Sequence, residues 1–141
     1  MRENSSRTLE NATGEIRTKN ARIRLEDGIV MVNFVPGAEE ILADAEENML
    51  ALEKICRGEK KPVYINPGPH KSMTRDARVY YVKESPRYST AIAVLARSPI
   101  AKLLSTFLIA LNKTINKDSM LLRFFTSEDE ALRWLRPFTM E

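Results

Sequence analysis

The chain has 141 residues, 43% of them hydrophobic, and this size predicts one domain around one core. The formal net charge is +3 and charges of both signs are interspersed, so no concentrated basic stripe indicates a nucleic-acid partner. No apolar run approaches the roughly 20 residues of a membrane span, and residues 1–20 lack the apolar core of a secretion signal. With Cys56 as the single cysteine, the composition predicts a cytoplasmic protein without a disulfide.

Strand and helix patterns alternate along the chain after a polar beginning. Residues 1–15 have no hydrophobic period and predict a tail, so the folded domain is expected over residues 16–141. In chain order, the expected elements are a strand within 16–26, a strand at 29–34, a helix at 38–57, a strand at 62–65, a helix from 74 to about 84, a strand at 91–96, a helix at 100–112, a strand at 120–125 and a helix beginning at 126–129.

Several turn and cap residues support these boundaries. Asp27-Gly28 is a hairpin signal between the first two strands, and Gly58 predicts the end of the first helix. Thr74 and Ser98 are good N-caps for the second and third helices. The helix over 100–112 is unusually apolar, which predicts either deep burial or packing against a second chain.

The order of elements is β-β-α-β-α-β-α-β-α. Crossover helices between strands predict parallel pairing, while the hairpin adds the first strand antiparallel to its neighbour. The sequence therefore predicts an α/β domain with a mixed, mostly parallel five-stranded sheet.

This pattern resembles the STAS domains of anti-sigma-factor antagonists, and most closely an uncharacterised bacterial branch described as STAS-like. The resemblance spans about residues 20–137. It implies a non-enzymatic regulatory module that acts by binding a protein partner, as a homodimer. The residues that carry it are Lys71-Ser72-Met73-Thr74-Arg75-Asp76-Ala77-Arg78, Arg97-Ser98-Pro99, and Arg123-Phe124-Phe125-Thr126 with Glu128, Ala131, Trp134 and Leu135.

One departure from that family concerns its phosphorylation switch. In the antagonists, the helix after the third strand begins with aspartate, a phosphorylatable serine and glycine. Aligning the helix starts places Thr74, Arg75, Asp76 and Ala77 on that run, so the switch serine is absent here. Ser72 and Thr74 remain candidate phosphorylation sites nearby.

Any binding site is expected at the carboxyl edge of the parallel strands, where helix N-termini converge. Cations and helix N-termini there would favour an anion or an acidic partner surface, although caps and solvated charges occur at every helix start. The candidate binding residues at this edge are His70, Lys71, Ser72, Thr74, Arg75, Arg97 and Ser98.

The chain offers few groups for catalysis or metal binding. His70 is the only histidine, so no His-His or His-Cys metal set is expected, and no glycine signature for a phosphate or a dinucleotide is present. No cofactor, metal or catalytic residue is therefore predicted.

Three hypotheses follow. The first is the protein-binding module, with an exposed apolar patch on the second or third helix and no deep cavity. The second is a carrier of a small apolar or anionic ligand, with a cavity lined by Tyr80, Tyr81, Phe107 and Leu108. The third is an enzyme that uses His70 with Ser72 or Arg97.

Overall fold

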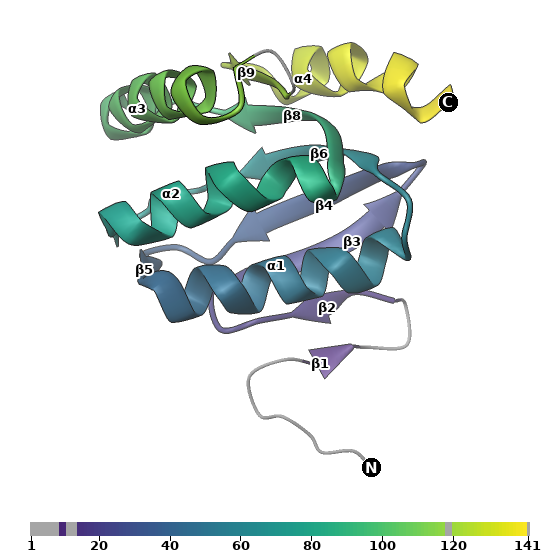
Figure 1. The fold of residues 1–141 in the computed structure, drawn as a ribbon, viewed down its shortest axis with the longest axis horizontal. Coiled ribbons are helices and arrows are strands. Elements are labelled where there is room, and N and C mark those ends of the chain that lie inside the picture. The colour runs from purple at the N-terminus through teal and green to yellow at the C-terminus, as the bar shows by residue number, and fades with distance from the viewer. Residues whose placement is uncertain (1–8, 11–13, 118–119, 141) are drawn as a thin grey trace.

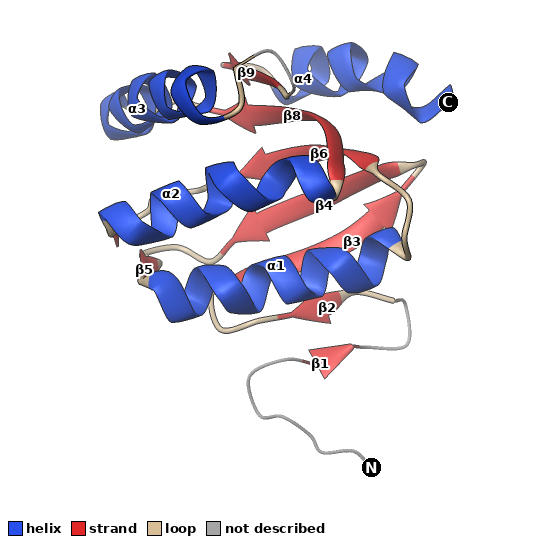
Figure 2. Cartoon of the chain, viewed as in Figure 1, coloured by secondary structure: helices blue, strands red, loops and turns tan. Residues whose placement is uncertain are grey.

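The computed structural model describes residues 9–10, 14–117 and 120–140. A seven-stranded sheet has the order β1-β2-β3-β4-β6-β8-β9, and two further strands, β5 and β7, form a small second sheet. The strands are β1 Leu9–Glu10, β2 Ile16–Arg17, β3 Ala21–Glu26, β4 Ile29–Phe34, β5 Glu39–Glu40, β6 Lys61–Asn66, β7 Ser72–Met73, β8 Ser89–Leu95 and β9 Leu121–Phe125. The helices are α1 Leu42–Cys56, α2 Arg75–Glu84, α3 Pro99–Ile115 and α4 Glu128–Leu135, with 3-10 turns η1 Ser85–Arg87 and η2 Arg136–Met140 (Figure 2).

The sheet is mixed, which confirms the coarse prediction of an α/β domain with a mixed sheet, although three of its six strand pairings are antiparallel instead of a parallel majority. Strands β1 to β4 pair antiparallel, and β4, β6, β8 and β9 pair parallel through crossover helices. The β3–β4 hairpin turns at Asp27 and Gly28, which both have positive φ (53° and 84°), as a tight two-residue hairpin turn requires.

The main sheet has seven strands where the sequence predicts five. The two additional strands precede β3: Leu9–Glu10 pairs with Ile16–Arg17, and β2 pairs with β3. Ile16 of β2 is buried beside Ile23, so part of the segment before β3 belongs to the sheet. Within the predicted tail, residues 1–8 and 11–13 lie outside the described part of the chain.

The first helix begins later than predicted, at Leu42 instead of residue 38. Glu39–Glu40 forms β5 and pairs in parallel with β7, and the Thr74 amide donates to the Glu40 carbonyl at 2.9 Å. The predicted N-caps of the next two helices are confirmed, because the Thr74 and Ser98 hydroxyls accept from the Ala77 and Ala101 amides. The last helix is capped by Ser127, one residue after Thr126.

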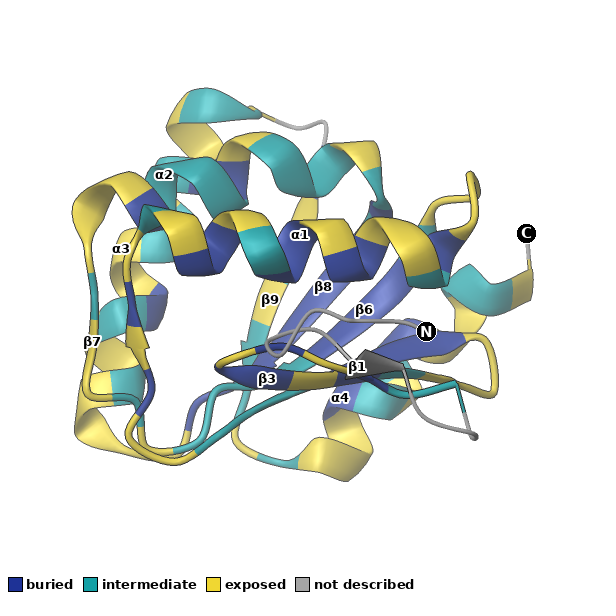
Figure 3. Cartoon of the chain, turned by 90° about the horizontal axis from the view of Figure 1, so that it is seen from below, coloured by how far each residue is buried: buried dark blue, intermediate teal, exposed yellow. Residues whose placement is uncertain are grey.

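The helices cover both faces of the sheet (Figures 1 and 3). Helices α1, α2 and α3 lie over the face that carries Ile23, Val32, Val63, Ile92 and Val94. Helix α4 and η2 cover the opposite face. Within the described residues, no helix is both long enough and apolar enough to cross a bilayer.

Candidate functional site

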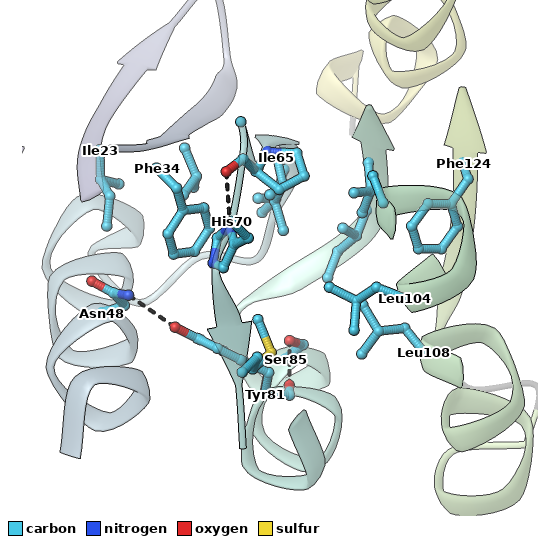
Figure 4. Close-up of a pocket in the computed structure, with 18 of the residues that line it drawn as sticks. Ile23, Phe34, Asn48, Ile65, His70, Tyr81, Ser85, Leu104, Leu108 and Phe124 are labelled. Carbon is cyan, nitrogen blue, oxygen red and sulfur yellow. Dashed lines mark hydrogen bonds between the residues drawn. The ribbon is translucent and has the colours of Figure 1, made fainter. Parts of the chain in front are cut away.

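A cavity of about 290 Å³ lies between the sheet and helices α1, α2 and α3 (Figure 4). In Figure 4, Leu104 and Leu108 of α3 stand on one side, and Ile23 and Asn48 stand on the other. Most wall atoms are carbon, because β-branched and aromatic side chains of the sheet face the inward side of α3. The side chains lining it include Ile23, Val32, Phe34, Asn48, Met49, Leu52, Val63, Ile65, His70, Met73, Tyr81, Ser85, Ser89, Ile92, Val94, Ser98, Ile100, Ala101, Leu104, Leu108 and Phe124.

A buried polar network closes one end of this cavity. The Asn48 amide nitrogen donates to the Tyr81 hydroxyl at 2.8 Å, and that hydroxyl donates to the carboxylate of Glu40. Glu40 is fully buried and also accepts from the Asn20 amide. Burial and the neighbouring Glu40 carboxylate hold the pKa of Tyr81 well above its usual value, so its hydroxyl stays protonated.

One ring nitrogen of His70, at the cavity wall, has no hydrogen-bond partner among the described residues. The ring's Nδ1 lies 2.8 Å from the Pro67 carbonyl oxygen and must carry the proton of that bond, because a carbonyl only accepts. In the neutral ring Nε2 is therefore an acceptor, and it has no partner among the described residues. Phe34 holds the ring edge-to-face at a centroid distance of 4.7 Å.

Ser89 supplies a second such atom. Its side chain lines the cavity and is 3% exposed, and its hydroxyl has no hydrogen-bond partner among the described residues. Buried polar atoms in native proteins are nearly always paired with protein or water, so two unpaired atoms in one apolar wall indicate groups that a bound molecule can satisfy.

The predicted site residues share one edge of the molecule, but the structure separates them into two groups. His70 and Ser98 line the cavity. The remaining five do not: Lys71 pairs with Glu39 at 3.3 Å, Ser72 lies in β7, Thr74 caps α2, Arg75 begins α2, and Arg97 Nε donates to the Thr126 carbonyl at 3.2 Å. Ser72 and Thr74 are both exposed, and their phosphorylation stays a prediction.

The lining predicted for a carrier is partly right. Tyr81 and Leu108 line the cavity, whereas Phe107 is 52% exposed and Tyr80 is not a wall residue. Phe34, Met73 and Leu104 also line the cavity although no pattern predicted them as wall residues, and the apolar character of the third helix was the signal that could have indicated Leu104.

Of the two residues proposed to act with His70, Arg97 bonds to the Thr126 carbonyl as described. Ser72 is exposed and lies in β7, where its backbone amide donates to the Ala38 carbonyl. Over the described ranges, no group of three or more His, Cys, Asp or Glu side chains is placed to hold a metal ion.

Cys56 is expected to react slowly with iodoacetamide in the native protein. Its side chain is 2% exposed, and burial raises the pKa of the thiol to about 11, against a smaller opposing effect of Lys61. Because the raised pKa keeps the reactive thiolate scarce, native labelling at pH 8 should be much slower than labelling in urea. Mass spectrometry of timed samples measures this ratio, and equal rates in both conditions would contradict the buried position.

One family model matches most of the chain. A family model described as a domain of unknown function, DUF7793, matches residues 23–139. The chain belongs to this family. Searches of curated proteins and of solved structures returned no match. The DUF7793 match begins in β3 and ends in η2, so it covers all four helices and every wall residue of the cavity.

Proposed function

We propose that this DUF7793 chain is a non-enzymatic binding module that holds a small, mainly apolar molecule in the cavity between α1, α2, α3 and the sheet. The observation that carries the proposal is the cavity itself, at about 290 Å³ with an apolar wall. Packed protein interiors leave few voids larger than a water molecule, so a space of this size against the core is a binding feature.

The wall also defines the character of the ligand. The free energy of ligand binding would come from apolar surface that is removed from water, at roughly 25 cal/mol per Å². The volume is near the lower end of small-molecule pockets, which start at about 300 Å³, and this favours a compact ligand. His70 Nε2, beyond the C-terminal end of β6, and Ser89 Oγ, at the N-terminal end of β8, are unpaired polar atoms, and each would orient a separate polar group of that ligand.

The STAS-like architecture and a cytoplasmic location belong to the same proposal. Its second candidate is the protein-binding homodimer, and one observation favours it. Strand β9 is the last strand on one side of the sheet, and its Leu121 is 49% exposed. An open edge strand is a template for pairing with a second chain.

Native mass spectrometry of the protein purified from its own host tests both candidates in one measurement. A retained small molecule is the result expected from the cavity. A dimer without an adduct would favour the homodimer as the functional form.

Two alanine-to-tryptophan variants on α3 test the cavity with a defined probe, N-phenyl-1-naphthylamine. Ala101 lines the cavity, so Ala101→Trp is expected to fill part of it and to weaken probe binding about tenfold or more. Ala110 is exposed on the same helix and is not a wall residue, so Ala110→Trp is the matched control and should bind like the parent protein. Fluorescence titration measures both. Equal probe affinity in a folded Ala101→Trp variant would overturn the cavity as the site.

A further inference from the structure

Helix α3 carries a row of large apolar side chains on its outward side. Ile100, Leu103 and Phe107 are 69%, 59% and 52% exposed, and spacings of three and four residues align them along one helix face. We call these three residues the α3 stripe. Exposed apolar residues on soluble proteins are usually scattered singly, whereas three on one helix face mark an interaction surface.

The charged residues of α3 and of the residues beside it, over 97–117, have one sign. The segment from residue 97 to residue 117 contains no aspartate or glutamate. It contains four basic residues, all of them exposed: Arg97, Lys102, Lys113 and Lys117. An apolar helix face on a segment whose charged residues are all cations is complementary to a surface that is apolar inside and anionic at its rim.

The α3 stripe is also continuous with the cavity. Ile100 belongs to both, because its side chain lines the cavity and remains 69% exposed. Ser98 and Ala101, on either side of it, line the cavity too. The start of α3 therefore connects the apolar interior with the outer apolar face.

We propose that the α3 stripe docks on the surface of an anionic lipid bilayer, with Ile100, Leu103 and Phe107 inserted among the lipids and the flanking cations against the headgroups. Docking there places the start of α3, where the cavity reaches the surface, at the bilayer, so that an apolar ligand passes between membrane and cavity without crossing water. The ligand-transfer part rests on the proposed function, whereas docking itself does not.

A second copy of the chain fits the α3 stripe less well. Pairing α3 with α3 would bring Lys102 and Lys113 of each copy against cations of the other, and residues 97–117 offer no carboxylate to neutralise them. An anionic bilayer supplies both the apolar interior and the negative charge.

Vesicle co-sedimentation tests docking with the full chain. Binding is expected to vesicles of equimolar phosphatidylcholine and phosphatidylglycerol, with little binding to phosphatidylcholine alone, and added salt should weaken it. The double variant Leu103→Ser, Phe107→Ser removes the apolar contact, and Lys102→Glu, Lys113→Glu reverses the charge. Each variant is expected to reduce the bound fraction about tenfold. For the charge reversal, the reason is that every cation near an anionic leaflet contributes a severalfold factor to binding.

Matched controls lie on α1. Leu50 is 62% exposed and Lys54 is exposed, so Leu50→Ser and Lys54→Glu each make one substitution of the same kind away from α3 and should leave vesicle binding nearly unchanged. The proposal is overturned if the parent chain ignores anionic vesicles, if both α3 variants still bind them, or if the apolar variant converts a dimer into a monomer. Titration of each variant with N-phenyl-1-naphthylamine distinguishes bilayer docking from ligand binding in the cavity. A variant that loses docking but binds the probe normally would leave the cavity proposal unaffected.

Discussion

Replacing Glu40 by alanine is expected to lower the free energy of unfolding by about 3 kcal/mol. Glu40 is 0% exposed and its carboxylate accepts from Asn20 and Tyr81. Removing it leaves buried donors without an acceptor and creates a void beside them, and each unpaired buried donor costs roughly 1–3 kcal/mol. Urea denaturation, compared at constant m-value, measures the difference.

The adjacent residue provides the control for that experiment. Glu39 lies in the same two-residue strand, but its side chain is 61% exposed and pairs with the exposed Lys71. Glu39→Ala should lower stability by less than about 1 kcal/mol, because exposed ion pairs contribute little. Similar losses in the two variants would mean that the network around Glu40 does not stabilise the fold.

The same network supports the cavity. Asn48 and Tyr81 are wall residues, and both are fixed by bonds that lead back to Glu40 or to each other. Their polar groups are thereby satisfied within the protein, which leaves mainly their carbon atoms for a ligand. The polar residues at this end therefore shape the cavity, while the atoms open to pairing are on His70 and Ser89.

The elements that the sequence predicts well are those with a local signal. Thr74, Ser98 and Asp27-Gly28 act through neighbours two to four residues away, and the structure confirms all three. The apolar run at 91–96 was likewise predicted to be a strand with parallel neighbours, and β8 pairs in parallel with β6 and β9. Capping, turn geometry and burial on both faces of a strand leave a pattern in a short window.

Elements that are very short, or that depend on contacts distant in sequence, were missed. Strands β1, β2, β5 and β7 have two residues each, too few to show a period of two. Glu40 looked like one more acid at a helix start, because its partners are 20 and 41 residues away. The cavity was predicted only as one of three alternatives, and two of its four expected wall residues, Tyr81 and Leu108, line it.

The third helix shows where sequence reasoning left two outcomes open. Its apolar composition predicted deep burial or a partner, and burial proved true of one side only, with Ser105 and Asn112 as its most buried residues. Polar side chains occupy those inward positions because each bonds to a backbone carbonyl, Ser105 to Lys102 and Asn112 to Met120. The large apolar residues Ile100, Leu103 and Phe107 remain outside, so the predicted partner of this helix stays a prediction.

Replacing Leu135 by alanine is expected to lower the free energy of unfolding by about 3 kcal/mol, within the usual range for a fully buried leucine. Leu135 is 0% exposed on α4, where it packs with Tyr64 and with the small side chains of Ala91, Ala93 and Ala131. Because alanines allow α4 to lie close to the sheet but cannot move to fill a void, the cavity left by the lost side chain should persist.

The single tryptophan reports on that region directly. Trp134 precedes Leu135 and contacts the rings of Phe125 and Phe138, with centroid distances of 5.6 and 5.5 Å, so its fluorescence follows unfolding of the α4 face in urea. Leu121→Ala is the matched control, since Leu121 is 49% exposed and its truncation should cost less than about 1 kcal/mol. A Leu135→Ala midpoint that matches the control would mean that α4 is not fixed to the sheet by this side chain.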